Sequence, residues 1–159
     1  MKLIKNISFL FLFLIPFLGF NQTIDIIKFD ELESKYTNNS DTVYLVNYWA
    51  TWCKPCVEEL PDFIKLNTLL KDQKFKMILV SLDFPSQIDS RVIPFIKEKG
   101  IQAEVVVLDD DANVWINKVN KDWDGDIPVT QIIQKRNKEF YNSTLTYSEL
   151  IDITELKLK

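Results

Sequence analysis

Three runs of the chain have the composition of strands that are buried on both faces. They are rich in β-branched and aromatic residues, and apolar side chains occupy both of their alternating faces. Such strands occur at the centre of sheets that helices cover on each side. The three runs span residues 42–50, 75–83 and 103–109. They predict a sheet whose centre is enclosed.

Between these runs, apolar residues recur three and four positions apart, which is the spacing of one helix face. Val57, Leu60 and Ile64 follow this spacing within residues 54–71. The same kind of reasoning predicts helices at residues 29–36, 86–100, 111–119 and from Thr146 onward. Helices therefore alternate with the strands along the chain.

Local signals mark the ends of these helices. Asp30 is the expected N-cap of the first helix, and Thr146 and Glu149 have the capping-box spacing at the start of the last. In the helix at 86–100, Pro94 predicts a kink and Gly100 predicts the C-terminal stop.

The chain after residue 23 is expected to form one domain. Residues 127–134 and 139–143 predict a β-hairpin around the turn "KRNK". Strands alternating with helices, closed by a hairpin and a helix, predict an α/β fold with a mixed central sheet flanked by helices on both faces. No repeat or linker divides residues 23–159, and the hydrophobic content of 47% over all 159 residues suffices for one core.

The first twenty residues have a different pattern. Lys2 and Lys5 precede the almost purely apolar run "ISFLFLFLIPFLGF" at residues 7–20. This arrangement is typical of a secretory signal peptide, because a membrane anchor usually needs about 20 apolar residues. We expect a signal peptide over residues 1–22 and a periplasmic or otherwise extracytoplasmic protein. The alternative is a retained N-terminal membrane anchor.

Composition excludes several classes of function. The net charge of −4 argues against a nucleic-acid footprint, which would need a basic face. The chain has no histidine, which removes histidine-based metal sites, Ser-His-Asp triads and Cys-His nucleophile pairs. The acidic run at residues 109–111 fits a turn with helix capping better than a cation site. We therefore expect neither a nucleic-acid partner nor a metal.

The candidate chemistry lies in "NYWATWCKPC" at residues 47–56, which holds the only two cysteines, Cys53 and Cys56. A structural disulfide here would close a four-residue loop and stabilise the fold by about 2 kcal/mol, against about 4.7 kcal/mol for a 100-residue loop. A structural zinc site needs four cysteine or histidine ligands, and the chain has two. A reactive dithiol remains.

The position of the pair supports this interpretation. Cys53 directly follows a buried strand and begins a helix, whose free N–H groups and dipole stabilise a thiolate. Lys54 adds a positive charge, and Pro55 falls in the first turn, where a missing N–H is tolerated. Cys56, one turn later, is expected to be more buried and to resolve a mixed disulfide formed by Cys53.

The longer stretch "NYWATWCKPCVEELP" at residues 47–61 resembles the TlpA/ResA-like branch of the thioredoxin fold. The shared pattern W-C-x-P-C-x-x-E-x-P corresponds to Trp52, Cys53, Pro55, Cys56, Glu59 and Pro61. Members of that branch are extracytoplasmic thiol–disulfide oxidoreductases. The resemblance implies a thioredoxin-like fold over most of the mature chain. It also implies no cofactor beyond the redox-active disulfide of the two cysteines.

The resemblance also implies roles for residues outside the pair. "GDIPVTQII" resembles the family's cis-proline segment, so Pro128 is the expected cis residue facing the dithiol, and Ile127 would offer backbone groups to a client peptide. Trp52 would belong to the partner-docking surface, to which we also assign Lys54 and Pro55. Trp49 is expected to pack in the core.

Two further side chains are expected near the dithiol. Glu59 lies three residues after Cys56 on the same helix face, and the resemblance implies that it modulates dithiol protonation. The alternative for Glu59 is a solvated helix glutamate. Asn47 occupies the position where cytoplasmic thioredoxins carry a buried acid. Because an amide cannot titrate, proton transfer with Cys56 would use Glu59 or water; Asn47 itself could equally be a hydrogen-bonded strand residue.

The function expected from the resemblance is reduction of disulfides in envelope proteins, for example apocytochromes in cytochrome c maturation. A thiol–electron donor in the membrane would re-reduce the pair, and we expect a monomer. A disulfide-donating oxidase or isomerase and a non-catalytic binding module are the alternatives. A peroxidase is disfavoured, because the peroxiredoxin pattern has proline seven residues before the reactive cysteine, where this chain has Val46.

Overall fold

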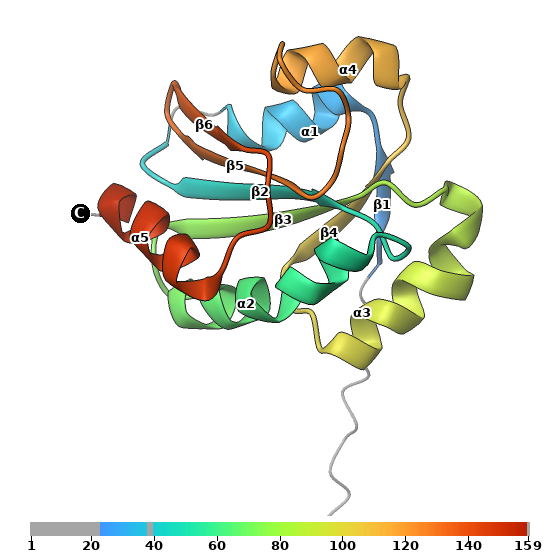
Figure 1. Ribbon diagram of the computed structural model, residues 1–159, viewed down its shortest axis with the longest axis horizontal. Coiled ribbons are helices and arrows are strands. Elements are labelled where there is room, and N and C mark those ends of the chain that lie inside the picture. Colours follow the sequence, from blue (N-terminus) through green and yellow to red (C-terminus); the bar gives the residue numbers. More distant parts are fainter. Residues whose placement is uncertain (1–22, 38–39, 159) are drawn as a thin grey trace, which may run out of the picture.

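The computed structural model describes residues 23–37 and 40–158, so the predicted signal peptide lies outside the described residues. Six strands form one mixed sheet in the order β1-β4-β3-β2-β5-β6 (Figure 1). The four parallel strands are β1 (Asp25–Ile27), β4 (Glu104–Leu108), β3 (Phe75–Ser81) and β2 (Val43–Trp49). The hairpin strands continue the sheet: β5 (Val129–Gln134) pairs antiparallel with β2, and β6 (Asn137–Tyr141) pairs antiparallel with β5.

Helices cover both faces of the sheet, as the apolar runs predict (Figure 1). One face carries α1 (Phe29–Tyr36) and α4 (Ala112–Val119). The other carries α2 (Lys54–Leu70), α3 (Ile93–Lys99) and α5 (Tyr147–Leu158). Every residue of β2 is buried, because its alternate side chains enter the two cores. The predicted α/β class and the enclosed sheet centre are therefore confirmed.

The segment before α3 differs from the predicted continuous helix at 86–100. A 3₁₀ turn (Pro85–Gln87) and a π-helical turn (Ile88–Val92) precede it. Pro94 lies in the first turn of α3, and its ring and missing N–H disturb the regular bonding of the residues before it. Gly100 ends α3 in the left-handed conformation, as predicted, with φ of 65°.

The predicted cap at Asp30 is wrong. The N-cap of α1 is Lys28, without a side-chain cap, and Asp110 Oδ2 accepts a hydrogen bond of 3.0 Å from the Phe29 N–H. Asp111 caps α4 by accepting from the Asn113 N–H at 3.0 Å, which confirms that the acidic run serves a turn and helix caps. The Thr146–Glu149 capping box is also confirmed.

Two strand boundaries also differ from the sequence pattern. β1 has only three residues, too few for a periodic signal, and no strand is predicted there. The hairpin turn comprises two residues, so β6 begins at Asn137, two residues before the predicted start. Lys135 takes the positive φ of 56° that such turns require, without the glycine or asparagine that usually marks it.

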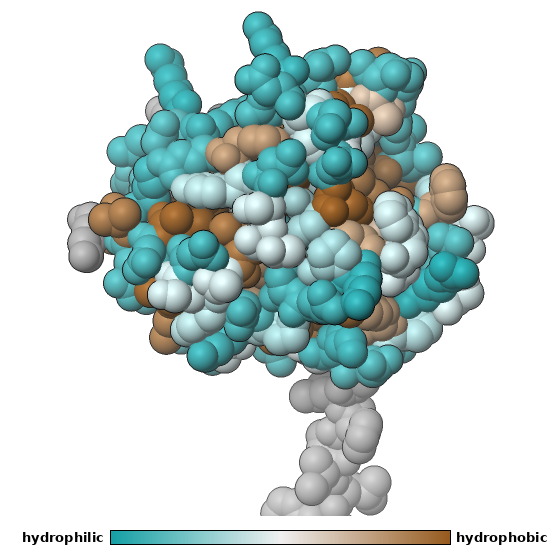
Figure 2. Space-filling model, in the orientation of Figure 1, coloured by the Kyte–Doolittle hydropathy of each residue, from teal (hydrophilic) through white to brown (hydrophobic). Residues whose placement is uncertain are grey.

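The face of the molecule seen in Figure 2 is largely hydrophilic, with hydrophobic residues showing in small areas between the polar ones. Over the whole described chain, the most exposed large apolar side chains are those of Leu156, Phe84 and Trp52. No helix in residues 23–37 and 40–158 is both long and apolar enough to cross a membrane.

Candidate redox site

The two cysteines form a disulfide at the start of α2. Their sulfur atoms are 2.02 Å apart. Cys53 is the N-cap residue of α2, and its Sγ accepts a hydrogen bond of 3.3 Å from the Cys56 N–H. Cys56 is fully buried and Cys53 nearly so, which agrees with the prediction that Cys56 is the more buried of the two. The fold thus directs a free N–H group of the helix start at Cys53 Sγ.

The backbone before β5 faces this disulfide. The peptide bond between Ile127 and Pro128 is cis, as predicted. The Ile127 carbonyl oxygen lies 3.7 Å from Cys53 Sγ. Residues 74 positions apart in the sequence therefore meet at the sulfur atom, and the cis-proline segment forms one wall of the site.

The side chains around Cys53 divide into exposed and buried groups. Trp52 is 58% exposed, whereas Trp49 is fully buried and packs against the Phe95 ring, 5.4 Å between centroids. Lys54 extends into solvent, where its Nζ lies 3.6 Å from Glu58 Oε1. Trp49 is therefore a core residue, as predicted. The positive charge of Lys54, next to Cys53, is partly offset by the exposed carboxylate of Glu58.

Glu59 is a buried carboxyl on the inner face of α2. Its Oε2 accepts a hydrogen bond of 2.9 Å from the Leu145 N–H, and its Oε1 accepts one of 3.1 Å from Asn47 Nδ2. Burial raises the pKa of Glu59 to about 7, and the hydrogen bonds from Leu145 and Asn47 oppose this rise in part. The alternative of a solvated helix glutamate is therefore excluded. This carboxyl changes its proton occupancy near neutral pH.

Asn47 connects three elements below the disulfide. Its Nδ2 donates to Glu59 Oε1 on α2 and, at 3.1 Å, to Thr130 Oγ1 on β5. Asn47 and Thr130 are paired residues in the β2–β5 register, so their side chains share one face of the sheet. Asn47 is therefore a hydrogen-bonded strand residue that also holds Glu59.

Three contributors to the site are absent from the sequence prediction. Thr130 follows Pro128 by two residues, and this strand alternation could have indicated its face. The Leu145 N–H reaches Glu59 across 86 residues, and no local pattern marks it. Asp83, two residues after β3, is a buried carboxylate that accepts from Thr51, and its only signal is an acid at the end of the apolar run of residues 75–83.

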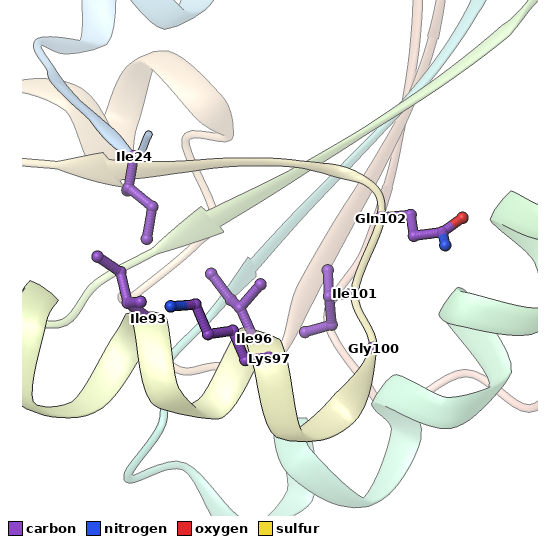
Figure 3. A pocket seen from close by; sticks show the side chains of 7 residues that line it. All are labelled: Ile24, Ile93, Ile96, Lys97, Gly100, Ile101 and Gln102. Atoms are coloured by element: carbon purple, nitrogen blue, oxygen red, sulfur yellow. The ribbon is translucent and has the colours of Figure 1, made fainter. Parts of the chain in front are cut away.

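Away from the disulfide, the described residues form an apolar hollow but no cluster suited to a metal ion. In residues 23–37 and 40–158, no group of three or more histidine, cysteine, aspartate or glutamate side chains could hold a metal ion. An apolar hollow of about 190 Å³ lies beside α3, where Ile24, Ile93 and Ile96 point toward one another (Figure 3). Its single charged lining residue is Lys97, and neither cysteine lines it.

The chain is similar in sequence to named thiol-disulfide oxidoreductases and thioredoxin-like proteins. Thioredoxin-like protein YneN of Bacillus subtilis is 31% identical over 111 residues, which cover 67% of this chain and 59% of YneN. Thiol-disulfide oxidoreductase ResA of Geobacillus kaustophilus is 28% identical over 107 residues, covering 66% of this chain and 57% of ResA. The chain spans less than two thirds of the length of these relatives.

Solved structures confirm the thioredoxin-like fold that the resemblance predicts. A thiol:disulfide interchange protein of the thioredoxin family from Chlorobium tepidum TLS superimposes with a TM-score of 0.63 at 22% identity, over 75% of this chain and 81% of that one. StoA from Bacillus subtilis has a TM-score of 0.59 at 20% identity, over 74% and 85%. The AhpC/TSA family model matches residues 22–138. The chain therefore belongs to the AhpC/TSA family.

Proposed function

We propose that this protein is an extracytoplasmic thiol–disulfide oxidoreductase that works mainly as a reductase of disulfides in envelope proteins. The observation that carries the proposal is the Cys53–Cys56 pair at the start of α2, with Cys53 Sγ beside the Ile127 carbonyl oxygen. The names of the relatives, thiol-disulfide oxidoreductase and thioredoxin-like protein, support this reaction class. The signal-peptide pattern at residues 1–22 supports the location.

The reaction begins with the reduced pair. The helix N–H groups at the start of α2 stabilise the Cys53 thiolate, which attacks one sulfur of the client disulfide. A Cys53–client disulfide forms, the client S–S bond breaks, and one client cysteine leaves as a thiolate that takes a proton from water. Trp52, Lys54 and Pro55 beside Cys53 would contact the client, and Ile127 and Pro128 would offer it an extended backbone.

Cys56 then resolves the intermediate. It must lose its proton inside the core, and Glu59, three residues further on α2, is the buried carboxyl available to accept it, with a pKa of about 7. The Cys56 thiolate attacks Cys53 Sγ, which closes the disulfide and releases the second client thiolate. Two electrons pass from the protein to the client, and a thiol donor in the membrane must return them. The cycle uses no cofactor besides the two sulfur atoms.

The client class follows from the same resemblance. Apocytochromes awaiting haem attachment are one candidate, because their cysteines must be reduced before they bind haem. We propose that the protein meets such clients as a monomer.

A trapping experiment tests the reductase cycle. In a Cys56→Ala variant, Cys53 still attacks clients but no resolving thiol remains, so mixed disulfides should accumulate and separate on a non-reducing gel. The variant with both cysteines replaced by alanine is the matched control and should trap nothing. If the Cys56→Ala protein expressed in the cell envelope captures no disulfide partner, the proposal gives way to a non-catalytic binding module.

A further inference from the structure

Asp83 is a buried carboxylate that the reaction described above does not use. It follows β3 and is 1% exposed. Its Oδ1 accepts from Thr51 Oγ1 at 2.6 Å, and its Oδ2 accepts from the Thr51 N–H at 3.0 Å and from Ser81 Oγ at 2.8 Å. A buried carboxylate is tolerated only when such donors satisfy it, so these contacts are a requirement of its position.

The residue that Asp83 binds belongs to the turn of residues 50–53. The Cys53 N–H donates to the Ala50 carbonyl oxygen at 3.1 Å and closes this turn, with Thr51 and Trp52 at its centre. The last backbone bond before the turn joins the Leu82 N–H to the Trp49 carbonyl oxygen at 2.8 Å. Asp83 therefore extends the contact between β2 and β3 past their ends, through a side chain that holds the turn.

The carboxylate is itself held from the other side. Ser81 Oγ donates to Asp83 Oδ2 and accepts from the Asp83 N–H at 3.1 Å, which makes a closed local ring. Asp83 thus has a fixed orientation without help from the turn. A group supported in this way can position reacting atoms, which must be held to within about 0.5 Å for efficient chemistry.

We propose that Asp83 is a positioning residue of the redox site, which fixes the turn of residues 50–53 through Thr51 and so directs Trp52 and Cys53 toward a client disulfide. This inference rests on the proposed function. Without Asp83, the turn keeps its one internal backbone bond and loses its outer support. Fewer encounters then place Cys53 Sγ in line with the client S–S bond, and exchange slows.

Substitutions at both ends of the contact test this role. Asp83→Ala should slow reduction of a disulfide-bridged fluorescent peptide by about tenfold, as expected for misplaced reacting groups. Asp83→Asn should restore the rate to within about threefold, because its oxygen can accept from the Thr51 N–H while its NH₂ donates to Thr51 Oγ1. Thr51→Val, which keeps the N–H contact and loses one hydroxyl, should slow exchange by about threefold.

Asp110→Ala is the matched control. Asp110 also accepts backbone N–H bonds, from Phe29 at 3.0 Å and Asp111 at 2.9 Å, but it serves α1 and α4 on the opposite face of the sheet. This variant should lower the melting temperature and leave the exchange rate within about twofold of wild type, since Asp110 shares no hydrogen-bond partner with the redox site and distant sites act independently. Rates are measured on the folded, reduced proteins at 20 °C.

Two outcomes would overturn the positioning role. One is an Asp83→Ala protein that melts earlier but exchanges with the peptide at the wild-type rate. The other, decisive if Asp83→Ala does not fold, is a Thr51→Val protein with an unchanged rate. Oxidised glutathione serves as a second substrate, because it needs no client docking. If the wild-type protein reduces glutathione disulfide but its Cys56→Ala variant traps no client, the proposed function is contradicted. The role of Asp83 can then still be judged from the rates at which the variants and wild type reduce glutathione disulfide.

Discussion

The two faces of the sheet bury very different material. Under α1 and α4, the core is an aromatic block in which Trp115 stacks on Tyr48 at 5.7 Å and on Phe29 at 6.2 Å between ring centroids. Under α2, the core includes a disulfide, the carboxyl of Glu59 and the amide of Asn47. Apolar packing stabilises a fold, whereas buried polar groups weaken it unless every partner is present.

The two faces of the sheet therefore differ in which of them carries the groups of the redox site. The α2 face carries the disulfide and a carboxyl whose pKa is displaced to about 7, and the buried cluster under α1 and α4 includes neither. Such displaced groups gather at functional sites. The comparison therefore predicts that substitutions on the two faces will affect different measurements.

The largest stability effect is expected on the aromatic face. Trp115 is 4% exposed, and Trp115→Ala should lower the free energy of unfolding by about 3–5 kcal/mol in urea titrations. The peptide-disulfide exchange rate per folded molecule should stay within about twofold of wild type, because the site is remote from the cavity formed.

Phe63→Ala sharpens the same comparison. Phe63 is fully buried on α2, one turn from Glu59, and its loss should reduce both stability and exchange rate. If Trp115→Ala slowed exchange as much as Phe63→Ala does, the faces would not be separable in function.

A smaller effect is expected from pH on the α2 face. Folding raises the pKa of Glu59 from 4.5 to about 7, so the folded state holds this proton more tightly than the unfolded state. In the oxidised protein, the contribution of Glu59 to the free energy of unfolding should therefore be fully present below about pH 4.5. It should fall by about 2–3 kcal/mol as the pH rises toward 7. Oxidised protein is used because its cysteines do not titrate.

In urea titrations between pH 5 and 8, Glu59→Gln should abolish this pH-dependent decrease in the free energy of unfolding. Glu58→Gln is the control, because Glu58 is the adjacent exposed carboxylate and pairs with Lys54 in solvent. In the reduced protein, Glu59→Gln should also change the pH profile of dithiol alkylation. Identical profiles in wild type and Glu59→Gln would remove Glu59 from the proposed proton transfer.

The smallest effect concerns the exposed edge of the α2 face. Trp52 is 58% exposed, so Trp52→Ala should leave the unfolding free energy within about 0.5 kcal/mol of wild type. If Trp52 contacts clients, KM for a peptide disulfide should rise several-fold while kcat changes little. An unchanged KM would exclude Trp52 from the docking surface.

The sequence predicted the elements with strong local patterns and missed contacts between distant residues. The helix at 29–36 has the observed bounds, and the strand at 42–50 is within one residue at each end, because their apolar spacing is local. The Glu59 carboxyl accepts a hydrogen bond from Leu145, and Thr51 in the turn of residues 50–53 donates to Asp83. The tertiary fold brings both partners into contact, so the spacing of residues around Glu59 and Thr51 does not predict them.

Caps show the same limit at smaller scale. Thr146 and Glu149 lie three residues apart and form the predicted capping box. The start of α1 instead receives its acceptor from Asp110, 81 residues away, and the local candidate Asp30 does not cap it. A side chain from another element can satisfy a helix end as well as a neighbour can, and no sequence pattern reports it.

The direction of electron flow is the central claim, and the reduction potential of the Cys53–Cys56 pair tests it most directly. Thioredoxin-fold proteins span potentials from about −270 mV to about −120 mV, a difference of roughly 7 kcal/mol for two electrons. Equilibration of the protein with glutathione redox buffers, followed by quantification of reduced and oxidised forms, gives the value. A reductase should have a potential well below about −200 mV, and a potential near −120 mV would instead identify an oxidant that donates disulfides.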